Sequence, residues 1–544
     1  MLTLQALTKF KSWFILAGST LFSLFLWGSN LKAKWGFLDD HEIIRFLGPS
    51  GNVSITGLPA LLSATELANP GTSPRYRPSY WLLRIMETFL WGDSPFLWYA
   101  CRIVLFALSV AIVWWLLDRY LGFLASLLFT AYIFSLPFWT DIWTRLGPAE
   151  TYAVFGCALY VLGFARVGEA WREGDRLRVN ALSNWLIMLV GSFIVLGAKE
   201  NMLFLMVPIL ILPGLLWKKN VLSATASIAS ALMAGYGVFV ATAVTMAMTR
   251  SGKDIYANDT GVGGRIELLA SGVERAINNQ VLICLALYLA VLFSLSVHLL
   301  LARKGTLKPL LKQGLNFFTL SALLMMLYVT QFLFYNGDWP SENFGRYNFP
   351  GLLVYPFFLL IAFHFSLKAI ATVFPGIGTE KWSRVALSVL GFVLVYSSDI
   401  PKLREAAQAR SQNTQAITAF VSSLSQTLHG DPQSSLFLMS SNVVVDTEPI
   451  TSVATFLRAN KVKNPIHAVV NMRSPQNMTN ARSEIGAKMI LNMINIQNNG
   501  SRDALAFSAP GKNDSHACYK VEFSGAGPDS RGCTSLMTIM PGGD

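Results

Sequence analysis

The chain has 544 residues, of which 53% are hydrophobic and only 14% are charged, and its mean hydropathy is +0.45. Soluble globular proteins carry about 25% charged residues, so this composition predicts a polytopic membrane protein. The formal net charge of +12 would also suit a protein that binds nucleic acid. The basic residues, however, fall in short clusters between apolar runs, which is the distribution that membrane topology produces. We therefore expect no nucleic-acid partner.

Eleven apolar runs have about the length that a helix needs to cross a bilayer. The first extends from about Trp13 to Leu31, and the others lie at about 96–117, 121–140, 151–166, 183–199, 201–217, 221–248, 280–301, 315–335, 347–367 and 383–398. The first run is long for a signal peptide and lacks a small-x-small cleavage site, so we interpret it as a membrane span. The basic clusters occupy alternate loops, which predicts that those loops lie inside. Lys32 and Lys34 oppose this topology locally.

The topology places residues 32–95 in a first outer loop, which we expect to contain two interfacial helices. In Pro78–Leu90, the large apolar residues share one broad face at 100° per residue, and Arg84, Glu87 and Thr88 lie opposite. Such a helix would lie in the membrane interface rather than cross it. A shorter helix is expected from His41 to Leu47, closed by Gly48 and Pro49.

The hydrophobic density falls near residue 400, which divides the chain into a membrane domain at 1–399 and a soluble α/β domain at 400–544. In the second domain we expect helices at 401–429, 451–460 and 483–495, the first closed by Gly430, and strands at 435–445, 465–471 and 517–523. A disulfide between Cys518 and Cys533 would imply an oxidising compartment outside the cytoplasm. We interpret Asp446, Glu448 and His467 as solvated surface residues.

Four ionisable residues, Asp39, Asp40, His41 and Glu42, directly follow the first span. Charged groups beside the hydrocarbon of a bilayer are unfavourable, so this cluster is a candidate functional site. An anchoring role is the alternative, but anchoring is usually done by Lys, Arg, Trp or Tyr. One aspartate could act as a base while the other makes a scaffold contact. A divalent metal held by Asp39, Asp40 and Glu42 is a second alternative, and no other cofactor is expected.

Two arginines in the same loop, Arg75 and Arg77, lie between Pro74 and Pro78. The planar guanidinium group suits phosphate oxygens, and the prolines restrict the backbone that carries it. These arginines are therefore candidates for binding the phosphate of a ligand. The alternative is that they pair with lipid headgroups.

Four motifs in this order on one membrane face resemble the GT-C superfamily. They are the acidic pair Asp39-Asp40, Arg77-Pro78 before an interfacial helix that ends near Trp91–Pro95, Lys199-Glu200 at a later outer corner, and Arg346-Tyr347 before a late span. This superfamily contains polytopic glycosyltransferases that use polyprenyl-phosphate-linked sugars, such as protein O-mannosyltransferases and the aminoarabinose and arabinofuranosyl transferases. The resemblance covers about residues 10–365.

The resemblance implies an inverting sugar transfer from a polyprenyl-phosphate donor to a hydroxyl of a glycan, a glycolipid or a protein. It implies a multi-pass protein of the bacterial inner membrane, with its site and C-terminal domain on the outer side. Asp39 would be the first choice for the base and Asp40 the second. Arg77, Lys199 and Arg346, together with Arg75, would meet the donor phosphate, and His41, Glu42, Glu200 and Tyr347 would support the site.

The loop at 249–279, with Gly261, Gly263 and Gly264, is expected to order when the donor binds. Two other classes of function stay open. A transporter or flippase would place its site near the middle of the bilayer, with ionisable residues inside broken spans. A non-catalytic scaffold would only present the C-terminal domain, and its aspartates would be replaceable.

Overall fold

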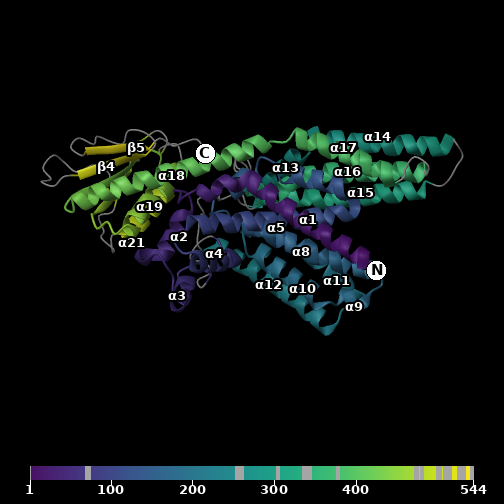
Figure 1. Cartoon of the computed structure of the whole chain (residues 1–544), viewed down its shortest axis with the longest axis horizontal. Helices are drawn as coiled ribbons and strands as arrows, with labels where there is room; N and C mark the ends of the chain where they lie inside the picture. Colours follow the sequence, from purple (N-terminus) through teal and green to yellow (C-terminus); the bar gives the residue numbers. More distant parts are fainter. Residues whose placement is uncertain are drawn as a thin grey trace.

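The computed structural model describes residues 2–67, 75–250, 262–277, 279–301, 307–333, 346–374, 380–470, 474, 477, 483–497, 505–506, 518–523 and 534–539. Helices dominate the structure. Figure 1 shows the long helices side by side, with the C-terminal domain and the short helices α2 (Asp40–Leu47) and α3 (Leu58–Ser63) at one end. The amino terminus and α9 (Arg176–Val179) lie at the other end.

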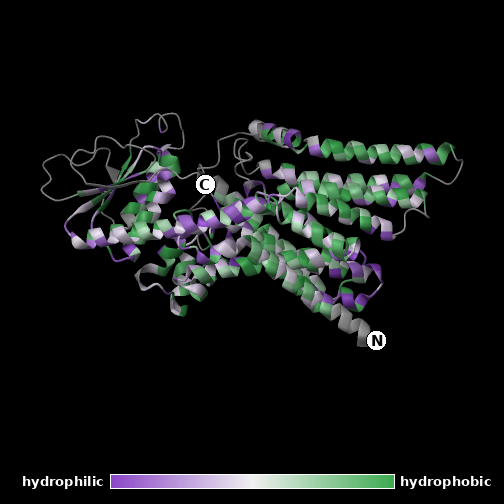
Figure 2. Ribbon diagram, turned by 45° about the horizontal axis from the view of Figure 1, so that its top comes forward, coloured by the Kyte–Doolittle hydropathy of each residue, from purple (hydrophilic) through white to green (hydrophobic). Residues whose placement is uncertain are grey.

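Within the described ranges, nine helical segments are long and apolar enough to cross a membrane. They are Phe10–Lys32, Pro95–Leu121, Glu150–Arg172, Arg176–Leu196, Glu200–Lys218, Ala224–Ala247, Gln280–Leu301, Lys308–Val329 and Gly351–Val373. A bent pair, Lys381–Tyr396 with Ile400–Gly430, is a tenth candidate. Figure 2 shows hydrophobic residues along the long helices of the bundle. A multi-pass helical membrane protein is therefore confirmed.

The helices that build these spans are α1 (Leu2–Trp27), α5 (Pro95–Leu121), α8 (Glu150–Arg172), α10 (Leu182–Leu196), α11 (Met206–Lys218), α12 (Ala224–Arg250), α14 (Asn279–Leu301), α15 (Lys308–Val329), α16 (Val354–Val373) and α17 (Glu380–Tyr396). Short 3-10 turns extend several of them: η1 (Gly28–Lys32), η4 (Glu200–Leu205), η5 (Thr330–Leu333) and η7 (Gly351–Leu353). The segment before α14 contains a helix of its own, α13 (Val262–Ala276).

The predicted span at 121–140 is wrong. The helix there, α6 (Phe123–Ile133), has only 11 residues and is followed by the short α7 (Trp139–Trp143). Pro137 lies between them, and a proline disfavours helical geometry in the residue before it and cannot donate to the helix ladder. The Trp139 indole donates a hydrogen bond of 2.7 Å to the Ile133 carbonyl, which satisfies the end of α6.

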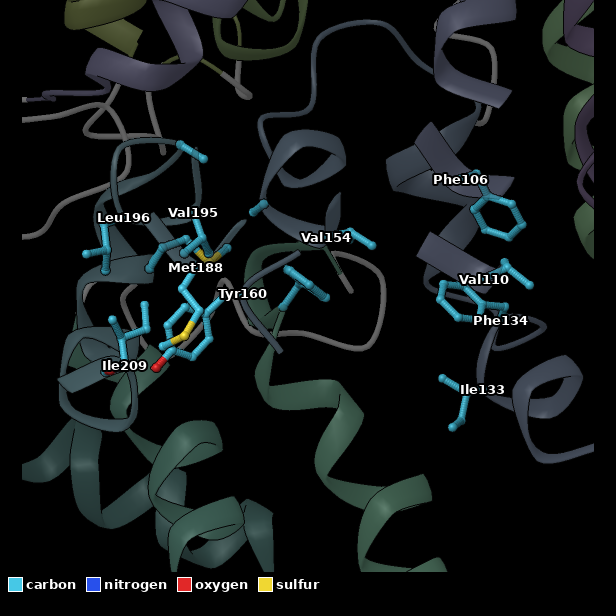
Figure 3. Packing of buried hydrophobic residues seen from close by; sticks show 14 of the residues in the cluster. Phe106, Val110, Ile133, Phe134, Val154, Tyr160, Met188, Val195, Leu196 and Ile209 are labelled. Carbon is cyan, nitrogen blue, oxygen red and sulfur yellow. Dashed lines mark hydrogen bonds between the residues drawn. The ribbon is translucent and has the colours of Figure 1, made fainter. Parts of the chain in front are cut away.

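The interior of the bundle depends on close contact between α8 and α10. A Cβ at Gly191 would lie 2.5 Å from the Tyr160 backbone nitrogen, and one at Gly163 would lie 2.8 Å from the Asn184 carbonyl oxygen. Small residues permit such close approach of membrane helices. Figure 3 shows the side chains that fill the surrounding core: Phe106, Val110, Ile133, Phe134, Val154, Tyr160, Met188, Val195, Leu196 and Ile209.

The predicted interfacial helix is α4 (Pro78–Trp91), and its polar face is buried together with Trp81 and Ile85 of its apolar face. Arg84, Glu87 and Thr88 are buried, whereas Met86 and Leu90 are 40% and 56% exposed. The reason is a buried ion pair. Glu87 accepts hydrogen bonds from both terminal nitrogens of the Arg102 guanidinium of α5, each at 2.8 Å. The polar face of α4 therefore anchors the outer loop to the bundle.

The C-terminal domain begins with α18 (Ile400–Gly430) and contains a five-stranded parallel sheet. The strands are β1 (Ser435–Ser440), β2 (Ile466–Val470), β3 (Leu505–Ala506), β4 (Cys518–Phe523) and β5 (Thr534–Ile539), in the order β3-β2-β1-β4-β5. Helices α19 (Val443–Ala459) and α21 (Ser483–Gln497) complete its described part. Cys518 is disulfide-bonded. Its predicted partner, Cys533, lies outside the described residues.

The predicted strand at 435–445 is only half right, because the chain enters α19 at Val443. Valines 443–445 favour a strand, but hydrogen bonds override this preference. Asp446 accepts from the Ser440 hydroxyl at 2.7 Å and from the Asn442 backbone at 3.4 Å, and the Val443 backbone donates to Asn477 at 2.9 Å. Asp446 is thus a buried structural residue and not a surface one. The predicted helix at 451–460 begins eight residues too late.

The C-terminal domain packs directly on the segment that follows the first span. The Lys34 backbone donates to the Thr414 hydroxyl of α18 at 2.9 Å, and the Gln415 amide donates to the Lys32 carbonyl at 3.0 Å. The Ser452 hydroxyl of α19 donates to the Phe37 carbonyl. The C-terminal domain therefore fixes the backbone around Asp39 and Asp40.

We expect the buried ion pair of α4 to matter far more for stability than an exposed one. Breaking a buried pair leaves an uncompensated charge, which destabilises a protein by about 3–5 kcal/mol. Glu87→Gln should therefore lower the free energy of unfolding by about that amount in detergent. The control is Glu173→Gln, which breaks an ion pair with Arg178 whose side chains are more than half exposed. That change should stay within about 1 kcal/mol. Equal unfolding curves for both variants would contradict the assignment.

Candidate functional site

The two aspartates of the acidic pair point to different environments. Asp39 precedes α2 as its N-cap residue, with a left-handed φ of 65°, and Asp40 is the first residue of the helix. Gly147 lies against Asp39, since a Cβ there would overlap the Asp39 carboxylate. The segment before α8 thus passes directly beside Asp39. The two aspartates therefore have different surroundings, and which of them faces a substrate stays a prediction.

Asp40 is the scaffold residue. Its side chain is completely buried, and one carboxylate oxygen accepts a hydrogen bond of 2.7 Å from the Gly36 backbone. The same oxygen lies 3.8 Å from Nη2 of Arg410 on α18. Burial raises the pKa of Asp40 to about 6, while the Arg410 charge and the Gly36 hydrogen bond oppose the rise. Asp40 therefore joins the end of the first span to the C-terminal domain, and no open surface leads to it.

Asp39 is the open residue, with 27% of its side chain exposed. Its Oδ2 lies 3.9 Å from Nη1 of Arg346, which is an ion pair without direct hydrogen-bond contact. Burial alone would raise the pKa of Asp39, but the positive charges of Arg346, Arg145 and Arg84 outweigh it and hold the pKa below its usual range. Asp39 is therefore a carboxylate at neutral pH.

Arg346 belongs to a network around the Lys199-Glu200 corner. Its Nη2 donates to the Tyr347 hydroxyl at 3.1 Å, and the Tyr347 ring lies 4.3 Å from Nζ of Lys199. Lys199 itself is buried and donates to Glu150 at 2.5 Å. Burial lowers the pKa of Lys199 to about 8, against the opposing charge of Glu150. Lys199 is thus a framework residue in this structure rather than an open phosphate ligand.

The other predicted phosphate-binding arginines lie on the same corner. The Arg77 Nε donates to Glu200 at 2.8 Å, which joins the first outer loop to the segment that follows α10. Arg75 is half-buried and is close enough to Glu200 to act on its charge. The next residue, Asn201, donates to the Phe349 carbonyl at 3.0 Å. The corner and the Arg346 segment are therefore tied together by hydrogen bonds.

His41 and Glu42 contact neighbours of the site. His41 Nδ1 lies 3.1 Å from the Ser452 hydroxyl, and burial lowers the pKa of the imidazole. Glu42 accepts a hydrogen bond of 3.3 Å from the Tyr80 hydroxyl of α4. Both residues therefore act at the junction between α2, α4 and α19.

Four residues of the cluster were not predicted from the sequence: Arg84, Arg145, Glu150 and Glu448. Arg84 is fully buried and donates to the Leu146 carbonyl at 2.6 Å, while its Nε and Nη2 lack hydrogen-bond partners among the described residues. The charge of Arg145 acts on both Asp39 and Glu448. Arg145 and Glu150 lie between the predicted spans at 121–140 and 151–166, and their charge between two apolar runs was an available signal. Glu448 had none, and its interpretation as solvated surface is wrong.

The predicted metal set is not assembled. Within the described part of the chain, no three His, Cys, Asp or Glu residues are grouped so that they could hold a metal ion. Asp40 makes its contacts inside the protein, so Asp39, Asp40 and Glu42 do not converge on one point. The glycines of the 249–279 loop also differ from expectation, because Gly263 and Gly264 belong to the first turn of α13, and Gly261 lies outside the described residues.

A cavity of about 380 Å³ lies between α2, α18 and α19, separate from the charge cluster. Among the described residues that line it, Asp93 is the charged one, and its carboxylate accepts a hydrogen bond of 2.8 Å from the Trp35 indole. The cavity contains none of the predicted site residues, so it does not enter the chemistry below.

The two aspartates should give opposite pH signatures in unfolding experiments. The folded-state pKa of Asp40, about 6, exceeds the usual 3.8, so its ionisation should destabilise the fold by about 3 kcal/mol as pH rises from about 4 to 6. The folded-state pKa of Asp39 is lowered, so Asp39 should stabilise the fold above pH 4 and lose this effect as pH falls.

The measurement is the unfolding midpoint in detergent between pH 3.5 and 7.5 for the wild type, Asp39→Asn and Asp40→Asn. As pH rises, the unfolding midpoint of the wild type should fall relative to that of Asp40→Asn. Over the same range, the wild-type midpoint should rise relative to that of Asp39→Asn. Differences of the same sign for both variants would contradict the assigned environments.

Comparison with known proteins adds no further constraint on this site. No protein-family model matches the chain, and no curated protein matches it either. The GT-C resemblance therefore rests on the four motifs alone.

Proposed function

We propose that this chain is a GT-C-type membrane glycosyltransferase that moves a sugar from a polyprenyl-phosphate donor to an acceptor hydroxyl. One observation carries the proposal. Asp39, a partly open carboxylate, lies 3.9 Å from the partly open Arg346 at the end of a helix bundle and beside the C-terminal domain. A base and a phosphate-binding cation are the two groups that this reaction needs next to each other.

The proposed reaction is an inverting displacement. The acceptor oxygen attacks the anomeric carbon and forms the new glycosidic bond, while the bond from that carbon to the phosphate oxygen breaks. The electron pair leaves on the phosphate oxygen, and the acceptor proton passes to Asp39. Arg346, together with Arg145, whose charge also acts on Asp39, would meet the negative charge of the departing phosphate. The energy comes from the lipid-linked sugar, so no nucleotide site is required.

The lowered pKa of Asp39 makes it a weak base when no donor is bound. The geometry indicates how donor binding would raise this pKa. Arg346 is the strongest of the positive charges that lower the pKa of Asp39. At 3.9 Å the pair lacks a direct hydrogen bond, so a phosphate anion can recruit Arg346 without breaking one. Once the phosphate neutralises this charge, the pKa of Asp39 rises. Donor binding would thereby strengthen the base.

The paired residues of the corner hold this arrangement in place. The ion pairs Lys199–Glu150 and Arg77–Glu200, together with the Asn201–Phe349 hydrogen bond, connect the first outer loop, α8 and the Arg346 segment. Catalysis requires that reacting groups be held within fractions of an ångström. We therefore assign Lys199, Arg77 and Glu200 to positioning, with Arg346 as the cation most available to a donor.

A transporter or flippase receives less support. Such a protein needs ionisable groups near the middle of its spans. In the described spans, most Asp, Glu, Lys and Arg side chains gather toward the ends, as Glu150, Glu200 and Lys218 illustrate, while His364 stands nearer the middle of its span. We place the site and the C-terminal domain on the extracytoplasmic side of a bacterial inner membrane, because the basic loops of the sequence lie at the other end of the spans. The acceptor is a glycan, a glycolipid or a protein hydroxyl.

The proposal is tested by sugar transfer in membranes that contain a radiolabelled pool of polyprenyl-phosphate sugars. Asp39→Asn should reduce transfer by about 10²–10⁴-fold, because the base is lost. The control is Asp93→Asn in the same outer loop, whose carboxylate is exposed and accepts a hydrogen bond from the Trp35 indole. It should retain transfer. Full activity of Asp39→Asn, in protein that unfolds at the normal temperature, would exclude the proposed base.

A further inference from the structure

One face of α19 continues from the domain contact into the charge cluster. Ser452 contacts the Phe37 carbonyl and His41, and Phe456, four residues later, stacks on the Phe37 ring with centroids 6.3 Å apart. Glu448 lies four residues before Ser452 and therefore on the same face of the helix. Two members of this face are in contact with the segment before α2. Glu448, the third member, continues this face of α19 toward Asp39, whose charge acts on it.

The surroundings of Glu448 come largely from the membrane domain. The charges of Asp39, Arg346, Glu42 and Arg145 all act on its carboxyl group. Burial is the main cause that raises the pKa of Glu448, to about 8; Asp39 and Glu42 add to the rise, and Arg346 and Arg145 oppose it. Among the described residues, Glu448 makes no hydrogen bond and no ion pair. A neutral carboxyl group thus lies near the carboxylate of Asp39, on the far side of a domain boundary.

We infer that Glu448 is the proton donor of the site, so that the C-terminal domain completes the active site. The inference rests on the proposed function. As the bond between the anomeric carbon and the phosphate oxygen breaks, the electron pair stays on the phosphate oxygen, which takes the proton from Glu448. The acceptor proton is meanwhile taken by Asp39. The products are the glycoside and the protonated polyprenyl phosphate, and one proton moves from Asp39 to Glu448 to reset the site.

Two carboxyl groups with opposite pKa displacements are the arrangement that separates a base from an acid in one site. Asp39 is surrounded mainly by cations, and Glu448 is half-buried near two acids. The inference also gives the C-terminal domain a role beyond folding. Ser452 and Phe456 would hold α19 in place so that Glu448 reaches the departing phosphate.

The experiment uses the full chain in membranes with the radiolabelled polyprenyl-phosphate sugar pool, from pH 5.5 to 9.5. Wild-type transfer should fall above about pH 8, as Glu448 loses its proton. Glu448→Gln should reduce kcat by about 10²-fold or more and lose this alkaline limb, with KM nearly unchanged. Glu448→Asp should recover part of the rate. The control is Glu484→Gln on α21, an exposed residue paired with Lys488, which should keep the wild-type profile.

A second readout does not depend on catalysis. Because the folded-state pKa of Glu448 lies above its usual value, the wild type should lose stability relative to Glu448→Gln as pH rises from about 4.5 to 8. At pH 4, where Glu448 is neutral, the two proteins should unfold at the same temperature. If Glu448→Gln transfers sugar at the wild-type rate and keeps the alkaline limb, this inference is overturned. The proposed function would then still be tested separately by Asp39→Asn. No transfer by the wild type would overturn both.

Discussion

The contact between α19 and the segment after the first span is the constraint on which the site depends. Ser452 and Phe456 bind the backbone and ring of Phe37, while Arg410 of α18 faces the buried Asp40. These contacts hold the turn in which Asp39 takes a left-handed backbone conformation. The exposed carboxylate is therefore positioned from both domains. A membrane bundle without the C-terminal domain would lack half of this support.

Charge balance at the end of the bundle explains the roles of the individual residues. Most acidic groups there have a cation of their own: Glu87 has Arg102, Glu150 has Lys199, and Glu200 has Arg77. These pairs are largely closed to solvent, so they fix geometry but offer little to a ligand. Asp39 and Arg346 differ because their contact is long and partly open. We therefore assign the proposed chemistry to Asp39 and Arg346, because a phosphate can separate this pair without breaking a direct hydrogen bond between them.

Much of the fold could be predicted from the sequence, because apolar runs of about 20 residues report membrane spans directly. The run at 121–140 misled, since Pro137 divides it and composition alone does not show where a helix ends. Valines 443–445 misled for another reason. Their preference for strands is weak, and hydrogen bonds of Asp446 and Asn477 fix a helix there. Asn477 is distant in sequence, and the contacts of Asp446 cannot be seen from local propensity. Local propensity fails where tertiary hydrogen bonds decide.

The site was predictable where its residues formed local motifs, as Asp39-Asp40 and Arg346-Tyr347 did. The sequence led us to expect different surroundings for Asp39 and Asp40, but which of the two is buried was not predictable, because it depends on Gly36, Arg410 and Gly147 from three separate segments. Glu448 was missed for the same reason. It stands in the second domain, between Thr447 and Pro449, and nothing in those neighbours reports the distant charges that surround it.

The central claim is that Arg346 exchanges Asp39 for the phosphate of a lipid-linked donor. The most direct measurement is the affinity of the purified full-length chain for polyprenyl phosphate without a sugar. Arg346→Gln should weaken binding by about tenfold or more, as expected for a lost charge-assisted contact. Asp39→Asn should bind at least as tightly as the wild type, because Arg346 then has no competing carboxylate. Unchanged affinity in Arg346→Gln, or weaker binding in Asp39→Asn, would contradict the account.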